Sequence, residues 1–375
     1  MHNIDSDSED ELPSGWEQKS TEDGSVYFVN SCTNKTQWTH PRTGRKKEIP
    51  KELPFGWTKT VDDEDKPVYV QKDTGQKTYV DPRLAFATDA KEHVHDFRQR
   101  FDASSTAFQV LHGVDLSGKY ALVTGSNAGI GYETAKSLAR HGCNVLFANR
   151  NMESTQQAIQ SIVQETKASE DDLKSIHLDL TSLQSVKKCA AAIKTVFSKF
   201  ADLKNVFTLQ NIAMPKDAYS FMMAYNNSKL YNVITAKVLS EEWRSKGIYV
   251  NSLHPGNMVY TNLCKSWWLF RLAFFLVRPF TKSLQQGAAT TVYAATAAEL
   301  EGVTGLYFNN CFYCEESAMA RDKNIAHELF AMTLKMIAAR VGTDGLQKYL
   351  DKYTTTQPLS KDETSGGTEQ KATIE

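Results

Sequence analysis

The pattern of hydrophobic and polar positions divides the chain into two regions of different character. Up to about residue 82, apolar residues occur in short runs such as Val26–Val29, and Asp-, Gly- and Asn-rich turns separate these runs. That pattern is typical of small antiparallel sheets. From Leu116 onward, short apolar runs alternate with longer segments that repeat with the period of a helix. The second region is therefore predicted to be α/β, with a doubly wound parallel sheet.

The second region is predicted to alternate strands with helices. Strands are expected at 120–124, 144–148, 175–180, 248–253 and 306–309, and helices at 130–141, 152–167, 183–199, 284–298 and 325–341. Residues 266–280 are apolar and aromatic with two arginines. We interpret this stretch as a flap over a substrate, with a core helix and a contact with a membrane interface as the alternatives.

Residues 125–131 carry three glycines between a predicted strand and a predicted helix: Gly125, Ser126, Asn127, Ala128, Gly129, Ile130 and Gly131. Glycines at this spacing let the backbone turn tightly and let a phosphate approach the main chain, where the N–H groups of the new helix meet a pyrophosphate. The spacing differs from the commoner G-x-G-x-x-G. The strand before the loop and the helix after it are what predict a dinucleotide site.

The residues at later strand ends predict which dinucleotide binds. Folds that bind NAD carry an acid about 20 residues beyond the glycine loop, and Asn149 and Arg150 occupy that place here. Since an arginine accommodates a 2′-phosphate, NADP is favoured over NAD. Asp179 either accepts from an adenine amino group or serves as an acid in the first turn of a helix. Pro255 and Gly256 form a turn at the carboxyl end of the sheet, where a nicotinamide would lie.

Tyr225 and Lys229 are the candidate catalytic residues. They are four residues apart on a predicted helix and therefore share one face of it. A tyrosine normally keeps its proton up to about pH 10. A neighbouring ammonium group and an oxidised nicotinamide stabilise the phenolate, which suits the pair to proton transfer.

Composition excludes several other classes of protein. The net charge of −1 argues against direct binding of nucleic acid. The six cysteines are scattered, and Cys311 and Cys314 form a C-x-x-C with no second pair to complete a zinc site, so no metal site is expected and a reduced, intracellular protein is the simpler interpretation. The acidic N-terminus cannot be a secretory signal, and the apolar stretch 267–280 is too short to span a bilayer.

The first region contains an internal repeat, with residues 12–41 repeated at 53–82. Both copies begin with Leu-Pro-x-Gly-Trp and end in Pro, and they resemble WW domains. The resemblance implies that Trp16 and Pro41 pack together as a miniature core. It also implies an aromatic groove for proline-rich ligands, which are already ordered as polyproline II. In the first copy the residues implied for this groove are Tyr27, Val29, Ser31, Thr36 and Trp38.

Two departures from the WW pattern affect ligand binding. WW domains that bind a ligand tyrosine usually carry His where this chain has Ser31, so binding of a Pro-Pro-x-Tyr peptide is expected to be weak. In the second copy Tyr79 replaces the groove tryptophan, Val68 replaces the groove aromatic residue, and Lys72 stands at the His position. That copy is interpreted as a structural companion to the first.

The motifs T-G-x-x-x-G-I-G, Y-x-x-S-K and the Pro-Gly turn together resemble the short-chain dehydrogenase/reductase family. The resemblance implies an NAD(P)-linked oxidoreductase acting on steroid- or retinoid-like alcohols. With the WW domains it implies recruitment of Pro-Pro-x-Tyr partners, including transcription regulators, and roles in growth control, cell death and tumour suppression. It further implies a location in cytoplasm and nucleus, with some association with mitochondria.

The segment between Lys199 and Tyr225 is too short for that family. It has 25 residues where a strand, a helix and another strand are needed, and one βαβ unit takes about 30 or more. The family's Asn-Asn-Ala-Gly and its catalytic Ser are both missing. The chain therefore has the character of a splice variant, or of a gene model with an internal deletion. Loss of strands four and five would open the middle of the sheet unless the sixth strand moved beside the first.

Two functions remain in competition, and a third class, a mis-spliced chain that folds poorly, stays open. The first is an NADP-linked enzyme. The second, which we favour for this chain, is an interaction protein that recruits partners through its first WW domain. The predicted organisation is an acidic disordered N-terminus (1–11), WW domain 1 (12–42), a degenerate WW domain 2 (53–83), a connector (84–115), the oxidoreductase domain (116–342) and a flexible tail (343–375). The basic cluster 42–47 is either a nuclear import signal or a solvated linker.

Overall fold

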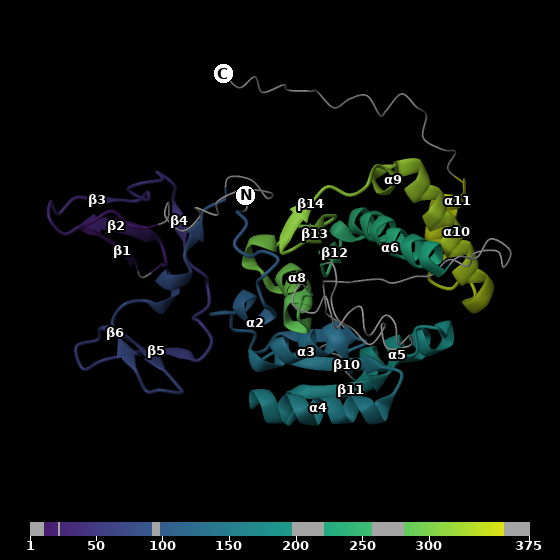
Figure 1. The fold of residues 1–375 in the computed structure, drawn as a ribbon, viewed down its shortest axis with the longest axis horizontal. Coiled ribbons are helices and arrows are strands. Elements are labelled where there is room, and N and C mark those ends of the chain that lie inside the picture. The colour runs from purple at the N-terminus through teal and green to yellow at the C-terminus, as the bar shows by residue number, and fades with distance from the viewer. Residues whose placement is uncertain (1–10, 22, 92–97, 197–220, 257–280, 356–375) are drawn as a thin grey trace, which may run out of the picture. The chain divides into compact units, whose positions relative to one another are not determined.

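The computed structural model describes residues 11–21, 23–91, 98–196, 221–256 and 281–355 (Figure 1). The chain forms two compact units. The first comprises Met1–Ile176 and Pro255–Val303, and the second comprises His177–His254 and Thr304–Glu375. Each unit is described by itself below.

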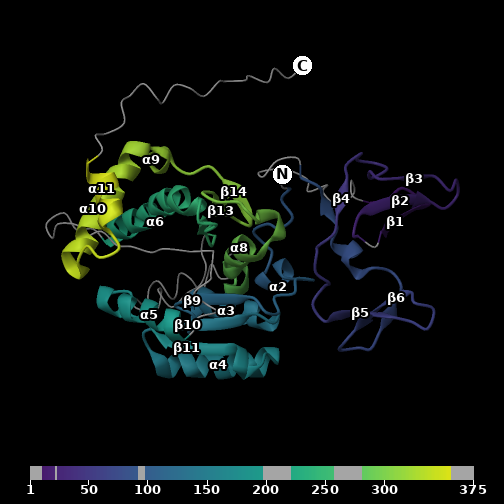
Figure 2. The same cartoon turned by 180° about the vertical axis from the view of Figure 1, so that it is seen from behind.

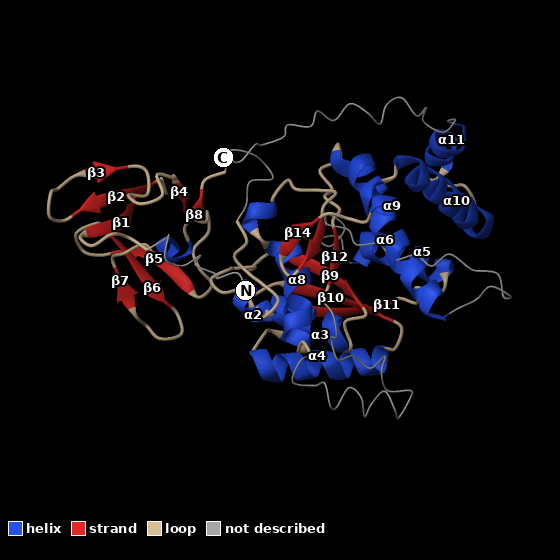
Figure 3. Cartoon of the chain, turned by 45° about the horizontal axis from the view of Figure 1, so that its top comes forward, coloured by secondary structure: helices blue, strands red, loops and turns tan. Residues whose placement is uncertain are grey.

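Two small antiparallel sheets form the N-terminal part of the first unit, as the repeat predicts (Figure 3). The first has the order β1-β2-β3 and the second β5-β6-β7. Their bounds are Trp16–Ser20, Val26–Asn30 and Thr36–Gln37 in the first sheet, and Trp57–Val61, Pro67–Gln71 and Lys77–Thr78 in the second. The pairings Trp16↔Asn30 and Trp57↔Gln71 occupy equivalent positions, so the two copies share one register.

The segment between the two sheets is ordered as a strand. Strand β4 (Lys47–Glu48) pairs antiparallel with β8 (Thr88–Asp89), which follows the short helix η1 (Pro82–Phe86). The ammonium group of Lys47 lies 2.8 Å from Oδ1 of Asp89, and the Lys47 side chain is 7% exposed. Arg45 binds the other carboxylate oxygen at 3.0 Å. The interpretation of 42–47 as a solvated linker is therefore wrong for Lys47, whose side chain is shielded from solvent and paired with Asp89, far away in sequence.

The glycine loop belongs to a parallel α/β layer (Figure 2). Strands β9 (Tyr120–Thr124), β10 (Asn144–Asn149) and β11 (Leu173–His177) have the order β11-β10-β9, with β9 and β10 parallel. Helices α3 (Gly129–Arg140) and α4 (Met152–Thr166) connect them, and α2 (Ala107–Val110) and α8 (Leu284–Thr296) pack with α3. The centre of the layer is β10, where Val145, Leu146 and Phe147 are fully buried. The predicted α/β fold is confirmed, and the connector packs on this layer through α2.

The described strands from Tyr120 onward form two separate sheets instead of one. Among the strands that the structure describes, β9 is hydrogen-bonded to β10 alone. Its residues are half-buried or exposed, whereas those of β10 from Val145 onward are buried. A separate sheet of order β12-β13-β14 (Ser252–His254, Tyr307–Asn309, Phe312–Cys314) lies in the second unit. The described residues contain no strand between β11 and β12 along the chain, and the segment in which the two central strands were expected to be lost lies largely outside the described residues.

Helices make up most of the second unit. Helix α6 (Phe221–Arg244) packs with α9 (Ala318–Arg321) and α10 (Lys323–Val341), and α10 packs with α5 (Leu183–Val196) and α11 (Gln347–Thr355). Its core includes Ile234, Val250, Leu329 and Phe330.

Three expectations about these elements need correction. Residues 347–355 are helix α11 rather than flexible tail, because Tyr353 is buried on α10 against the ring of Phe330. The third strand is Leu173–His177 rather than 175–180, because Asp179 already begins the turn into α5. Strand β12 starts at Ser252, four residues later than predicted. The proposed flap, residues 266–280, lies outside the described residues.

Candidate functional site

The first WW domain presents two aromatic rings on the open face of its sheet. The ring centroids of Tyr27 and Trp38 lie 5.8 Å apart with their planes at 58°. Trp38 is 57% exposed, which is unusual for a tryptophan. Side chains alternate along a strand, so Val29 lies on the same face as Tyr27, and the sheet register pairs Val29 with Thr36. Four of the five predicted groove residues therefore share one surface.

Ser31 lies at the end of this surface and is exposed. Its hydroxyl donates to the carbonyl oxygen of Gly15 at 3.0 Å, and its backbone N–H donates to the same oxygen at 2.8 Å. The hydroxyl thus duplicates a contact that the main chain already makes. Nothing in this arrangement requires a serine at position 31.

The opposite face of the first WW domain is closed by a pair of rings that the sequence did not single out. Phe28 is fully buried, and His40 is 1% exposed and meets it edge-on at 5.3 Å. Nδ1 of His40 accepts from the backbone N–H groups of Arg42 and Thr43. Trp16 and Pro41, predicted to form the miniature core, are both half-buried. Nothing in the local sequence indicates that a histidine just after a strand is buried. The burial of His40 was therefore not predicted.

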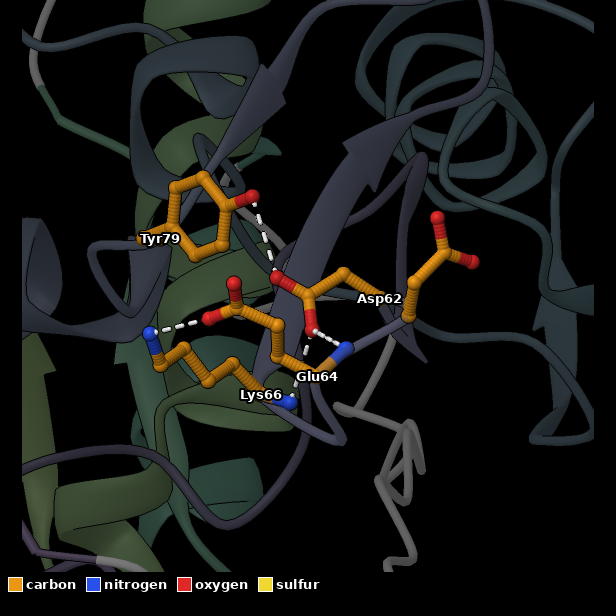
Figure 4. Close-up of a pocket in the computed structure, with 5 residues that line it drawn as sticks. Asp62, Glu64, Lys66 and Tyr79 are labelled. Atoms are coloured by element: carbon orange, nitrogen blue, oxygen red, sulfur yellow. Dashed lines mark hydrogen bonds and ion pairs between the residues drawn. The ribbon is translucent and has the colours of Figure 1, made fainter.

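The second WW domain uses its groove tyrosine differently (Figure 4). The hydroxyl of Tyr79 donates to Oδ2 of Asp62 at 3.1 Å, and Asp62 Oδ1 also accepts from the backbone of Glu64 and Lys66. The backbone N–H of Lys66 has the largest effect on the pKa of Asp62, and together with the N–H of Glu64 it holds this pKa below its usual value. These residues line a shallow pocket with an acidic wall. Val68 stands at the position equivalent to Tyr27, so among the described residues Tyr79 has no aromatic partner like the one that Tyr27 gives Trp38.

The glycine loop has the backbone that the sequence predicts. Gly125 and Gly129 have φ angles of 64° and 62°, a region where other residues are strained. A Cβ atom at Gly131 would lie 2.8 Å from the carbonyl carbon of Gly125 and closer still to its oxygen. The third glycine is therefore required by the close approach of helix α3 to the loop.

The first turn of α3 is open to an anion. Its N-cap residue is Ala128, which offers no side-chain hydrogen bond, and the first turn contains no acidic residue. The first N–H groups of a helix have no partner within the helix, and they favour a phosphate that lies against the helix end. The space around Gly125 and Gly129 is also empty to 4 Å where a Cβ would stand. These residues fit the pyrophosphate of a dinucleotide.

Asn149 and Arg150 have different environments, although both were predicted to bind the cofactor. Asn149 is 3% exposed, and its amide binds Ser126 and Thr155 beneath the loop. Arg150 is exposed. Asn149 therefore serves the loop, and within this pair Arg150 is the residue available to a ligand. Asn127 also braces the loop, because its amide donates to the hydroxyl of Ser154 at 2.8 Å.

Asp179 occupies the turn that precedes α5. Its Oδ1 accepts from the backbone N–H of Thr181 at 2.9 Å and from the Thr181 hydroxyl at 2.7 Å. Its backbone N–H donates to the hydroxyl of Ser185. These contacts are those of an aspartate that closes a turn ahead of α5, whose own first turn contains no acidic residue.

Tyr225 and Lys229 share one face of α6, as predicted. The ammonium group of Lys229 lies 5.1 Å from the centroid of the Tyr225 ring, and Tyr225 is 42% exposed. The pair belongs to the second unit, whereas the glycine loop belongs to the first. Pro255 and Gly256 are half-buried in the first unit, and Gly256 has a φ angle of 97°.

The described residues lack two further features, a metal-binding cluster and a helix that could span a membrane. No cluster of three or more His, Cys, Asp or Glu side chains able to hold a metal ion was found in them. No helix in the described part of the chain is long and apolar enough to cross a membrane.

Comparisons with known proteins match both parts of the chain. Residues 12–41 match the WW domain family, and residues 119–214 match the short chain dehydrogenase family. The WW domain-containing oxidoreductase of Drosophila melanogaster is 44% identical over 399 residues, covering 90% of this chain and 98% of the relative. The Homo sapiens protein of the same name is 37% identical over 403 residues, covering 90% of this chain and 97% of the relative. Retinol dehydrogenase 12 of Mus musculus is 28% identical over 279 residues, covering 60% of this chain and 88% of the relative.

The match with the Drosophila protein is longer than the number of residues that this chain contributes to it. Ninety per cent of 375 residues is about 338, so about 60 of the 399 positions matched with the Drosophila protein have no residue of this chain. The match nevertheless extends over nearly the whole relative, from its WW region through its oxidoreductase region. The chain therefore belongs to the family of WW domain-containing oxidoreductases.

Proposed function

We propose that this chain acts as a peptide-recruiting adaptor, in which the first WW domain binds Pro-Pro-x-Tyr segments of partner proteins such as transcription regulators. The observation that carries the proposal is the ring pair of the half-buried Tyr27 and the exposed Trp38. Two rings at this separation form a slot for a proline, and a polyproline II ligand has little conformational entropy left to lose. The second WW domain lacks such a pair and supports the first.

The oxidoreductase domain supplies a binding site for NADP. The N–H groups at the start of α3 and the glycine loop hold the pyrophosphate, and the exposed Arg150 meets the 2′-phosphate. A nicotinamide cofactor, when bound, supplies or accepts a hydride. For an alcohol or carbonyl substrate, the Tyr225 hydroxyl would give or take the accompanying proton.

Turnover by this chain is not part of the proposed function. The sequence offers no serine on a predicted strand at the expected distance before Tyr225, and β9 lies at the edge of its sheet among the described strands. In a doubly wound sheet the cofactor lies at the switch point beside the first strand. The shortage of about 60 positions relative to the Drosophila protein supports a loss within the matched part of the chain.

An enzyme of retinoid- or steroid-like alcohols is the second candidate. It is favoured by the intact glycine loop and by the similarity to a retinol dehydrogenase. The two candidates differ in one measurable property, because the enzyme oxidises NADPH in the presence of a carbonyl substrate and the adaptor does not.

The test of the adaptor function is a peptide titration with the full chain. A labelled Pro-Pro-x-Tyr peptide should bind, Trp38→Ala should remove the binding, and Tyr79→Ala at the equivalent position of the second WW domain should leave it unchanged. Equal binding by the Trp38→Ala variant and the parent would reject the proposal.

A further inference from the structure

Asn149 lies at the end of β10, directly beneath the glycine loop, and is almost completely buried. Its Oδ1 accepts from the backbone N–H of Ser126 at 2.8 Å. Its Nδ2 donates to the hydroxyl oxygen of Ser126 at 3.0 Å and to that of Thr155 at 3.1 Å. One amide group thus joins the loop, the end of the central strand and the first turn of α4.

The chemistry of the contacts requires an amide. Two donors on one atom and an acceptor on the other are what a carboxamide offers. The hydroxyl of Thr155 gives its own proton to the carbonyl oxygen of Asn151 at 2.6 Å, so it accepts from Asn149. A carboxylate at position 149 could still accept from Ser126, but it could not donate to Thr155, whose hydroxyl would have to give up its hydrogen bond to Asn151 in order to supply a proton. A leucine would leave the buried N–H of Ser126 without a partner, which is costly.

The position of Ser126 determines the shape of the loop. Ser126 follows Gly125, whose left-handed backbone turns the chain, and Gly131 packs against the carbonyl group of Gly125. A loop that binds an anion through main-chain N–H groups must hold those groups in place before the ligand arrives. Asn149 is the side chain that fixes the residue between the turn and the helix.

We propose that Asn149 is a positioning residue that holds the glycine loop in the form that binds the dinucleotide pyrophosphate, without touching the ligand itself. The inference rests on the NADP site of the proposed function. The residues involved all belong to the first unit, so the effect extends to any ligand that carries the adenosine and pyrophosphate half of NADP.

The test measures nucleotide affinity and loop protection separately. Calorimetry with 2′-phospho-ADP-ribose gives the affinity of the full chain, and hydrogen exchange gives the protection of the Ser126 amide. Asn149→Leu should weaken binding about tenfold or more and should speed exchange at Ser126. Asn149→Asp should keep part of the Ser126 protection and bind less tightly than the parent.

Asn144→Leu is the matched control, because Asn144 lies at the other end of the same strand and donates to the carbonyl oxygen of Lys119 at 3.2 Å. It should change neither quantity. If Asn149→Leu lowers the melting temperature but binds the nucleotide as the parent does, the role of Asn149 is structural and the inference is overturned. A parent chain that binds no 2′-phospho-ADP-ribose rejects the NADP site and the inference with it.

Discussion

The hydroxyl of Tyr69 donates a hydrogen bond to Oδ2 of Asp81 at 3.2 Å in the centre of the second WW domain. The equivalent positions of the first WW domain hold Phe28 and His40, which meet as two rings. Arg83 completes the second arrangement, because its guanidinium group binds both oxygens of Asp81. The second copy therefore has a charged network where the first has an aromatic contact, and it forms the same sheet. Its groove, however, lacks the aromatic pair of the first copy.

We expect Asp81→Ala to destabilise the second WW domain by about 1–3 kcal/mol, since it leaves Tyr69 and Arg83 without their partner. Burial alone would raise the pKa of Asp81, but hydrogen bonds from Arg83 outweigh it and hold this pKa below its usual value. A lowered pKa in the folded state means that the stabilisation is complete above the unfolded value, about 3.9, and is lost as the pH falls through the folded value. Hydrogen exchange of the β6 amides, followed as a function of pH, measures this loss of stability.

Asp63→Ala is the control for Asp81→Ala. Asp63 is exposed in the loop of the same sheet, so its removal should leave the stability nearly unchanged. Exchange profiles of Asp81→Ala that coincide with those of the parent at every pH would contradict the role assigned to the network.

The sequence predicts the strands and helices around the glycine loop to within about one residue. Strand 120–124 is observed as predicted, and helix 130–141 is observed as Gly129–Arg140. The signal is strong there because the apolar runs and the glycines agree on the same boundaries. Strand β11 was misplaced because Leu178 is apolar and buried although the strand ends at His177. The turn made by Asp179 overrides the apolar pattern.

Long-range contacts account for most of what the sequence did not predict. Lys47 is buried by Asp89, and Tyr353 by Phe330, and neither pair is recognisable from local composition. The candidate site shows the same limit. The position of Asn149 in the strand predicts a residue near the cofactor, whereas its contact with Ser126 depends on the loop folding back over the strand end.

Ser31→His should strengthen the binding of a Pro-Pro-x-Tyr peptide by about fivefold to tenfold, since one added aromatic contact contributes about 1 kcal/mol. The serine hydroxyl duplicates a backbone hydrogen bond to Gly15, so its loss should not disturb the fold. Titration of the labelled peptide measures the change. Thr33→His places the same ring two residues away on an exposed position, and an equal gain from both variants would show that the effect is unspecific.

Arg150→Ala should remove the preference for NADP over NAD. Hydrogen bonds to a charged group contribute about 1.5–3 kcal/mol, so the affinity for 2′-phospho-ADP-ribose should fall about tenfold or more, while that for ADP-ribose stays the same. Lys174→Ala removes an exposed positive charge from β11 and serves as the control. Equal affinities of the parent for the two nucleotides would count against the assignment of Arg150.

The last prediction is that this chain has no dehydrogenase turnover, although it retains Tyr225 and Lys229. Loss of one preorganised donor to the substrate oxygen costs about 10²–10³ in rate. An open cleft costs more, because correct positioning is worth about 7 kcal/mol or more. Purified protein should therefore oxidise no NADPH with a panel of ketones and aldehydes, and NADPH fluorescence should not change, because the nicotinamide ring stays in water even when the adenosine half is bound. A chain with the Drosophila relative's segment inserted between Lys199 and Tyr225 should alter that fluorescence on binding NADPH. Turnover by the unmodified chain that disappears in Tyr225→Phe would refute the prediction, because it would show that the catalytic pair reaches the cofactor without the missing strands.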